Sequence, residues 1–266
     1  MSESRILLVE DNHINQVVAG KILARGGLTA DVADSGEKAL QLLAERPYDL
    51  VLMDIRLPGI DGVETSRRIR SGESGVLNPD VAIIALTAYS SDEDHVTCIS
   101  AGMNDYLSKP LEINRFLEVV SNYVQPPSDG EQGDGTDTTS EARSPETSGR
   151  DTPLFDRNTL DAQLGGDDAL AEVAVATFLG LLDRKLLRLE GAVANDRDED
   201  AYREAHAIAG AAGNVAAARL EGVLREIEAL SRSGRLDEAR QLLPVLQEIA
   251  RETRTILEEF RRDHSP

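Results

Sequence analysis

The stretch YDLVLMD, residues Tyr48–Asp54, places four consecutive apolar residues directly before a carboxylate. An unbroken apolar run of this length is typical of a parallel strand that is covered on both faces of its sheet. Five short apolar runs, several of them continuous, alternate with segments of helical spacing in the first half of the chain: RILLVED, TADVADS, YDLVLMD, VAIIALTA and NDYLSKP. This alternation predicts an α/β domain with a doubly wound, five-stranded parallel sheet between two layers of helices.

The second half of the chain has a different pattern, without any strand signal. Apolar residues recur at helical spacing in four long segments, and a shorter helical segment lies near residues 157–164. The breaks between these segments fall at GGDD, NDRDED, NVAA and SRSGR. Apolar faces of this kind, joined by short breaks, predict an all-α four-helix bundle.

Residues 125–152 separate the two halves and have a composition of their own. They contain no Leu, Ile, Val, Met or aromatic residue, and they carry seven acidic residues against two arginines. Such a segment cannot bury enough apolar surface to offset the entropy that ordering costs, so it is expected to be a disordered, acidic linker rich in Gly, Ser, Thr and Pro. The predicted division is a first domain at 1–124, a linker at 125–152 and a helical domain at 153–266.

Charge and cysteine content limit the classes of partner and the compartment. The formal net charge of −20 would repel nucleic acid and anionic membranes, so neither is expected as a direct partner. The single cysteine, Cys98, excludes an internal disulfide and fits a reducing cytosol. The N-terminus shows no signal-peptide pattern, and no apolar run reaches the roughly 18 residues of a membrane span. The sequence therefore predicts a cytoplasmic protein without membrane insertion.

Polar side chains end four of the five predicted strands. In open α/β sheets, the reactive crevice lies beyond the carboxyl ends of the strands. The residues at these ends are Glu10, Asp11, Asp54, Thr87 and Lys109. Three crowded carboxylates repel one another unless a cation neutralises them, and hard oxygen ligands in an incomplete cage suit Mg²⁺. A metal ion, an ammonium group and a hydroxyl that converge on one carboxylate predict phosphoryl transfer to that carboxylate.

Four motifs in the first half carry a family resemblance: LLVEDNHINQ, DLVLMDIRLPGIDG, ALTA and YLSKP. Over residues 5–124 the sequence resembles the receiver domains of response regulators, which implies a flavodoxin-like fold. The resemblance implies that Asp54 is the phosphoacceptor. It also implies that the side chains of Glu10, Asp11 and Asp54, together with the backbone carbonyl of Arg56, hold Mg²⁺.

The same resemblance implies roles for residues on the fourth and fifth predicted strands. Thr87 and Lys109 would bind the phosphoryl oxygens, and the Lys109–Pro110 peptide bond would be cis. Receivers switch when the threonine moves toward the phosphoryl group and a neighbouring aromatic side chain turns inward. Tyr106 occupies that aromatic place, so phosphorylation of Asp54 is expected to be read on the face around the fourth helix and the fifth strand.

One histidine of the second half, His206, lies among small residues in the stretch YREAHAIAGAAGNVAAARLEG. On a helix it shares its face with Ala209, Gly210 and Gly213. Glycine inside a helix costs about 1 kcal/mol relative to alanine, so a compensating role is expected. One hypothesis is clearance, because a histidine nucleophile must come within about 3–3.5 Å of phosphorus. The alternatives are a core histidine satisfied by hydrogen bonding, and small residues that allow close helix packing.

Residues 154–262 resemble histidine phosphotransfer (HPt) domains, with the match centred on AHAIAGAAGNVAAARLEGVLREIE. The resemblance implies a bundle in which His206 carries the phosphoryl group without catalysing its own phosphorylation. One departure concerns charge, because the family usually has lysine three residues after the histidine and this sequence has Ala209 there. Arg203 or Arg219 is a candidate for supplying the missing positive charge.

Two functions are compatible with these features. In the first, the chain is a phosphorelay signalling protein, a phosphoryl carrier rather than an enzyme. Asp54 accepts a phosphoryl group from a phosphohistidine of a sensor or hybrid histidine kinase, and His206 exchanges one with its own receiver or with another receiver or HPt partner. In the alternative, phosphorylation of Asp54 regulates a binding module, and His206 is not phosphorylated. Ala209 favours the binding module, whereas the retained histidine and the glycines favour the relay.

Overall fold

The computed structural model describes residues 5–72, 75–87, 92–124 and 152–264. Its five strands form one parallel sheet in the order β2-β1-β3-β4-β5, which is the flavodoxin-like order expected from the sequence. Their bounds are β1 (Ile6–Val9), β2 (Ala30–Ala33), β3 (Leu50–Asp54), β4 (Ala82–Thr87) and β5 (Asp105–Ser108). The continuous apolar run of β3 is completely buried, as expected for a central strand with helices on both faces.

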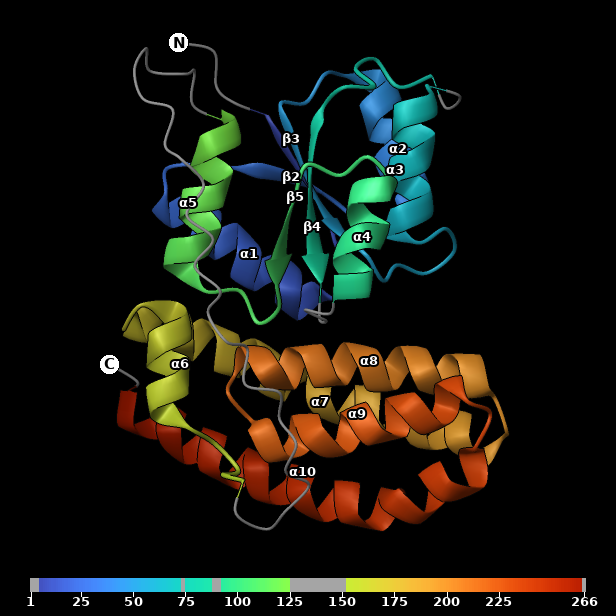
Figure 1. Cartoon of the computed structure of the whole chain (residues 1–266). Helices are drawn as coiled ribbons and strands as arrows, with labels where there is room; N and C mark the ends of the chain where they lie inside the picture. The colour runs from blue at the N-terminus through green and yellow to red at the C-terminus, as the bar shows by residue number, and fades with distance from the viewer. Residues whose placement is uncertain (1–4, 73–74, 88–91, 125–151, 265–266) are drawn as a thin grey trace.

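Two layers of helices cover the sheet (Figure 1). Their bounds are α1 (His13–Arg25), α2 (Gly36–Glu45), α3 (Gly62–Ser71), α4 (Asp92–Ser100) and α5 (Ile113–Val124). Residues of α1 and α5 share one apolar cluster with the sheet, and residues of α2, α3 and α4 share the other. The side chains of Asn12, Ser35 and Asp61 cap the first turns of α1, α2 and α3, so the local sequence sets where these helices begin.

The second half is a helical bundle, as expected. The bundle helices are α6 (Arg157–Leu164), α7 (Asp168–Ala194), α8 (Asp198–Asn214), α9 (Ala218–Arg232) and α10 (Leu236–His264). Helix α8 packs between α7 and α9, and α10 packs against both α7 and α9. Asp156 and Asp167 cap α6 and α7, and Gly165 ends α6 in the left-handed conformation that glycine favours.

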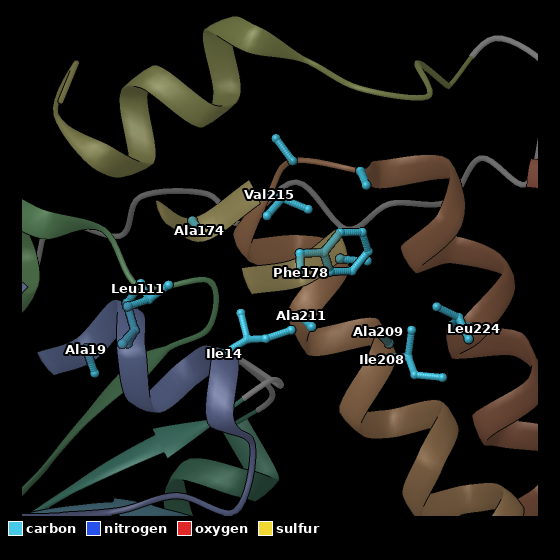
Figure 2. Close-up of a cluster of buried hydrophobic side chains, with 14 of the residues drawn as sticks. Ile14, Ala19, Leu111, Ala174, Phe178, Ile208, Ala209, Ala211, Val215 and Leu224 are labelled. Carbon is cyan, nitrogen blue, oxygen red and sulfur yellow. The ribbon is translucent and has the colours of Figure 1, made fainter. Parts of the chain in front are cut away.

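The carboxyl edge of the sheet faces the bundle, with α8 directly beneath it (Figure 1). Helix α1 packs against α7 and α8. The apolar cluster on the α1 side of the sheet continues into the bundle, and Figure 2 shows Ile14 of α1 pointing toward Ala211 of α8. The predicted linker, residues 125–152, lies outside the described residues except for Thr152. Among the described helices, none has both the length and the apolar character that crossing a bilayer requires.

Candidate functional site

The carboxyl ends of β1 and β3 bring the three predicted acidic residues together. The parallel register pairs Val9 with Met53, so Glu10 and Asp54 follow at neighbouring positions. Carboxylate oxygens of Glu10, Asp11 and Asp54 all lie within 4.8 Å of one another. Glu10 and Asp54 are buried, whereas Asp11 is exposed. We call this group the acidic cluster.

Lys109 supplies a positive charge to the acidic cluster. Its Nζ donates to Glu10 Oε2 at 2.5 Å and to Asp54 Oδ2 at 2.7 Å. Burial acts to lower the pKa of Lys109, but the two carboxylates outweigh it and raise that pKa above its ordinary value. Burial, followed by the charge of Asp54, raises the pKa of Glu10 to about 8. A single ammonium group therefore leaves the cluster short of positive charge.

The donor set of the acidic cluster fits a hard divalent cation. Mg²⁺ prefers oxygen ligands and is usually held by a few carboxylates in an incomplete cage. The raised pKa of Glu10 indicates that the carboxylates favour taking up positive charge, and a divalent ion within reach of all three would provide it. The side chains present in this pocket are therefore suited to Mg²⁺.

Amide side chains fix the position of Glu10, a role that the sequence analysis did not give them. Glu10 Oε1 accepts from the backbone N–H of Asn12 at 3.1 Å and from Asn15 Nδ2 at 2.9 Å. Gln16 Nε2 donates to the backbone carbonyl of Glu10 at 2.6 Å. All three donors lie at the start of α1 or one residue before it. The beginning of this helix therefore holds the buried carboxylate in one orientation.

The other predicted receiver residues surround the acidic cluster in different ways. Thr87 ends β4 and is buried, and its carbonyl oxygen accepts from the backbone N–H of Lys109 at 2.6 Å. The Lys109–Pro110 peptide bond is cis, as predicted. The backbone N–H of Arg56 donates to Asp54 Oδ1 at 3.1 Å. Tyr106 lies on β5 with 40% of its surface exposed, so its side chain is in an outward position.

His206 lies on α8 in a partly buried position, with 15% of its side chain exposed. Its Nδ1 lies 2.9 Å from Oε1 of Glu228 on α9. A carboxylate can only accept, so this contact requires the proton on Nδ1, and in the neutral ring Nε2 is then the nitrogen with a lone pair. Arg225 Nη1 lies 3.0 Å from Oε2 of Glu228 and 3.4 Å from the ring nitrogen.

Glu228 stays ionised because of its neighbours. Burial acts to raise its pKa, but the hydrogen bond and charge of His206, together with Arg225, lower that pKa to about 2. The sequence analysis gave no role to Glu228 or Arg225. A usable signal was present, because Glu228 continues the buried face of α9 that Leu220, Leu224 and Ile227 form, where an apolar residue would be ordinary.

A receiver side chain also reaches the histidine site. Arg56 Nη1 pairs with Glu228 Oε1 at 3.1 Å, across the contact between the two halves. The Arg56 guanidinium also lies over the ring of Tyr202, 5.5 Å from its centroid. Tyr202 stacks on His206 with 6.3 Å between ring centroids and an interplanar angle of 20°. A residue that follows Asp54 by two positions thus contacts both groups that flank His206.

The small residues near His206 have three different surroundings. A Cβ built on Gly210 would lie 3.9 Å from Asn15 Nδ2, so Gly210 faces the receiver and gives it clearance. A Cβ on Gly213 would lie 3.1 Å from Glu221 Oε2, so Gly213 instead allows close packing with α9. Ala209 is fully buried and belongs to the apolar core (Figure 2). Gly213 therefore fits the alternative of close helix packing, Ala209 is a core residue, and Gly210 is the small residue of the three that faces the receiver.

The two arginines proposed to replace the family lysine are also placed differently. Arg203 is exposed and pairs with Asp200 at 2.6 Å. Arg219 Nε donates to the carbonyl of Thr152 at 2.9 Å, at the beginning of the helical domain. Neither is seen in contact with His206 among the described residues. Arg225 of α9 instead places a cation beside the ring, with its Nη1 at 3.4 Å from His206 Nδ1.

Polar contacts join the acidic cluster to α8. Asn12 Nδ2 donates to the carbonyl of Ala207 at 2.7 Å, and Asn214 Nδ2 donates to Asn15 Oδ1 at 2.7 Å. Asn15 in turn donates to Glu10, so a chain of hydrogen bonds runs from the bundle to the buried carboxylate.

Burial and Asp54 raise the pKa of Asp11, whereas Lys109, Lys185 of α7 and His206 act to lower it.

A cleft of about 700 Å³ opens beside this contact. It is lined from the receiver by Asp11, Asp34 and Pro58, and from the bundle by residues of α7 and α8, among them Lys185 and Ala207. Lys185 Nζ lies 3.6 Å from Oε2 of Glu204, so this lysine has an acidic partner within the bundle. Asp11 and Ala207 thus lie where solvent can reach the boundary between the acidic cluster and the histidine helix.

Comparison with known proteins finds two domain families in the chain. The sequence model of the response regulator receiver domain matches residues 6–121, and that of the Hpt domain matches residues 173–262. The chain is 38% identical over 122 residues to hybrid signal transduction histidine kinase L of Dictyostelium discoideum, covering 45% of this chain and 7% of that protein. It is 30% identical over 223 residues to the aerobic respiration control sensor protein ArcB of Escherichia coli, covering 84% of this chain and 27% of that protein.

Among solved structures, the receiver domain of sensor histidine kinase PA1611 from Pseudomonas aeruginosa is 38% identical, with a TM-score of 0.42. The match covers 46% of the present chain and 98% of the PA1611 chain. In the PA1611 structure a magnesium ion is coordinated in the active-site cleft. The curated relatives are much longer, so the present chain spans only a small part of each. The chain therefore joins a response regulator receiver domain, over residues 6–121, to an Hpt domain, over residues 173–262.

Proposed function

We propose that Asp54 and His206 exchange a phosphoryl group within one chain. The observation that carries this proposal is the docking of α8 on the carboxyl edge of the sheet (Figure 1). Asn12, next to the acidic cluster, bonds the carbonyl of Ala207, which neighbours His206. Arg56, next to Asp54, bonds the carboxylate that holds His206. Contacts at both sides thus hold the phosphoacceptor pocket and the imidazole at one boundary.

We further propose that Glu10, Asp11, Asp54 and the backbone carbonyl of Arg56 hold Mg²⁺. When bound, this ion would neutralise the carboxylates and the oxygens of the incoming phosphoryl group. Lys109, whose Nζ lies 2.7 Å from Asp54 Oδ2, would pair with a phosphoryl oxygen, and the Thr87 hydroxyl would donate to another. These residues supply alignment and positive charge, which are the main needs of phosphoryl transfer.

In the exchange step, the lone pair of His206 Nε2 attacks the phosphorus of the Asp54 acyl phosphate. The N–P bond forms while the bond between phosphorus and the Asp54 oxygen breaks, and that electron pair leaves with the Asp54 carboxylate. The ring gains one positive charge and the carboxylate regains one negative charge, so the total charge is unchanged. Nδ1 keeps its proton and continues to donate it in a hydrogen bond to Glu228, whose negative charge stabilises the charged ring.

The chain would act in this relay as a phosphoryl carrier rather than as a kinase. The upstream donor is proposed to be the phosphohistidine of a sensor or hybrid histidine kinase, and other receiver or HPt domains are further exchange partners. Phosphorylation of Asp54 would draw Thr87 toward the phosphoryl group and turn Tyr106 inward from its exposed position. We place this activity in the cytoplasm, where the thiol of the buried Cys98 would stay reduced.

The presence of both domains favours the relay over the binding module. The structure also weakens the one feature that favoured the module, because Ala209 is a core residue and Arg225 provides a cation beside the ring. Neither residue would then argue against a phosphorylated His206.

Bond chemistry tests the proposed function. The full chain is incubated with Mg²⁺ and acetyl phosphate, and the label is divided by stability to base. Acyl phosphate at Asp54 is labile to base, whereas phosphohistidine survives base and is lost in acid. We expect base-stable label in the wild type, none in His206→Gln, and neither kind of label in Asp54→Asn. Base-stable label that persists in His206→Gln would contradict the proposal.

A further inference from the structure

Glu228 is a buried carboxylate that residues from both domains share. Only 2% of its side chain is exposed. Its Oε1 accepts from His206 Nδ1 at 2.9 Å and from Arg56 Nη1 at 3.1 Å, and its Oε2 accepts from Arg225 Nη1 at 3.0 Å. A buried charge is tolerated only with hydrogen-bonded partners of opposite charge. One of these partners, Arg56, is present only while the receiver is docked on the bundle.

Within the bundle, Glu228 acts on the ring of His206. The contact fixes the Nδ1–H tautomer and the ring orientation, as the buried aspartate does for the histidine of a Ser-His-Asp triad. N–H groups of His206, Arg56 and Arg225 all donate to the two buried oxygens of Glu228, an arrangement that favours the charged carboxylate. Positive charge that develops on the ring during phosphoryl transfer is therefore met by a fixed negative charge.

Arg56 connects this carboxylate to the phosphoacceptor. Its backbone N–H bonds Asp54 Oδ1 at 3.1 Å, while its guanidinium reaches Glu228 and the ring of Tyr202. Arginine suits this place because its planar guanidinium can pair with a carboxylate and stack on an aromatic ring at the same time. The Arg56 side chain is 22% exposed and that of Glu228 is 2% exposed, so this charge pair is largely removed from water in the docked state.

We propose that Arg56 and Glu228 form a matched pair that makes a receiver with this arginine the preferred exchange partner of His206, beginning with the receiver of the same chain. Glu228 is the positioning residue and Arg56 is the specificity determinant. A receiver without a cation at this place would leave Glu228 with fewer partners, and an acidic residue there would repel it. The inference rests on the proposed exchange between Asp54 and His206.

The pair can be tested with two full-length chains, one of which only donates and the other of which only accepts. The donor carries His206→Gln and is loaded at Asp54 with acetyl phosphate and Mg²⁺, freed of the reagent and quantified. The acceptor carries Asp54→Asn, so base-stable label on it arises only from the donor. Rates are expressed per loaded donor, so any effect of a substitution on loading does not enter.

Arg56→Glu is then introduced into each partner in turn, and opposite results are expected. In the donor it removes the arginine that Glu228 of the acceptor needs, and transfer should slow about tenfold or more. In the acceptor it frees Glu228 and His206 from the acceptor's own receiver, and transfer from the unmodified donor should become faster. Arg67→Glu, the same charge change at an exposed position of α3, is the matched control and should have no opposite-signed effect.

The positioning role has a spectroscopic readout. In the full chain, the ¹⁵N shifts of the His206 ring should report the Nδ1–H tautomer. Glu228→Gln, which keeps an acceptor oxygen, should largely retain this tautomer, and Glu228→Ala should lose it. Should Glu228→Ala fail to fold, Glu228→Gln and the Arg56 variants still decide the question.

The inference is overturned if Arg56→Glu changes the transfer rate in the same direction in donor and acceptor, or in neither. It is also overturned if the ring tautomer is the same in the wild type and in Glu228→Ala. Failure of the proposed function would look different, because base-stable label would then be missing from the unmodified donor and acceptor as well.

Discussion

Glu10 in the receiver and Glu228 in the bundle are buried to nearly the same extent, with 1% and 2% of their surface exposed. The pKa of Glu10 is raised to about 8, mainly by burial and by Asp54, whereas the pKa of Glu228 is lowered to about 2 by His206 and Arg225 against the effect of burial. Glu10 shares one lysine with another carboxylate, and Glu228 has three cationic or potentially cationic partners. Two carboxylates with nearly the same exposed fraction therefore have pKa shifts of opposite sign, because their charged neighbours differ.

This difference explains how the two halves divide the work. The receiver pocket has one lysine for three carboxylates and is suited to take up a metal ion and a phosphoryl group. The histidine site is already balanced by protein side chains and needs only to orient the ring. We therefore expect Mg²⁺ to act on the receiver pocket and to have no direct partner around Glu228.

The largest effect is expected from Lys109→Ala, which leaves Glu10 and Asp54 buried without their shared cation. Removal of one partner from a buried ion pair usually costs about 3–5 kcal/mol in the free energy of unfolding. Guanidinium unfolding without Mg²⁺, followed by circular dichroism, measures this cost. Added Mg²⁺ should restore part of the stability, because it supplies the missing charge. An equal loss with and without Mg²⁺ would contradict the role given to the cluster.

Glu228→Gln tests the opposite electrostatics of the bundle. A folded pKa of about 2, below the ordinary 4.5, means that the charged form stabilises the fold above pH 4.5 and that this stability is lost as the pH falls toward 2. The wild type should exceed the variant by about 3 kcal/mol near pH 7, at about 1.4 kcal/mol per pKa unit. Urea unfolding of both proteins at several pH values gives this difference. A difference that does not shrink below pH 4.5 would show that charge is not its cause.

For Glu10→Gln without metal, the stability difference from the wild type should change with pH in the opposite direction. A folded pKa of about 8, above the ordinary 4.5, means that stability is full below pH 4.5 and is lost as the pH rises through 8. The variant avoids this loss, so in EDTA it should gain on the wild type by at least about 1 kcal/mol between pH 5 and pH 9. With Mg²⁺ present the order should reverse, because the variant lacks a ligand. Thermal unfolding in EDTA at both pH values tests this, and a stability difference from the wild type that is the same at pH 5 and pH 9 would rule it out.

The sequence was sufficient for the fold because each element depends on residues near one another in the chain. The apolar run Leu50–Met53 predicts a buried strand from four adjacent residues, and the side chain of Asp61 caps the helix that begins at the next residue. The acidic cluster was predictable for a related reason, since parallel strands end at one edge and carry their last residues there.

The surroundings of His206 could not be predicted in the same way. Glu228 lies 22 positions away on another helix, and its contact with His206 depends on how α8 and α9 are aligned. The pairing of Glu228 with Arg56 joins residues 172 positions apart in different domains. Ala209 and Gly213 were expected beside the histidine, but three-residue and seven-residue spacings do not reveal which neighbouring helix covers each position.

The smallest effect is expected at Gly210, where α8 meets the receiver. A Cβ there would make an ordinary contact with Asn15, so Gly210→Ala should raise the free energy of unfolding by up to about 1 kcal/mol through helix propensity and leave docking intact. Gly210→Leu would occupy the space that Asn15 needs, and formation of phosphohistidine should slow. Equal transfer rates in the alanine and leucine variants would show that the glycine does not provide clearance for the receiver.

The exchange within one chain is tested most directly by dilution. Wild-type protein labelled at Asp54 is diluted before the base-stable label forms, and the first-order rate constant of its appearance is measured at each concentration. Tethered domains have an effective concentration on the order of millimolar, so the rate constant should be the same at about 1 μM and about 100 μM protein. A rate constant that falls in proportion to the protein concentration would show that His206 takes its phosphoryl group from other molecules, and would contradict the account.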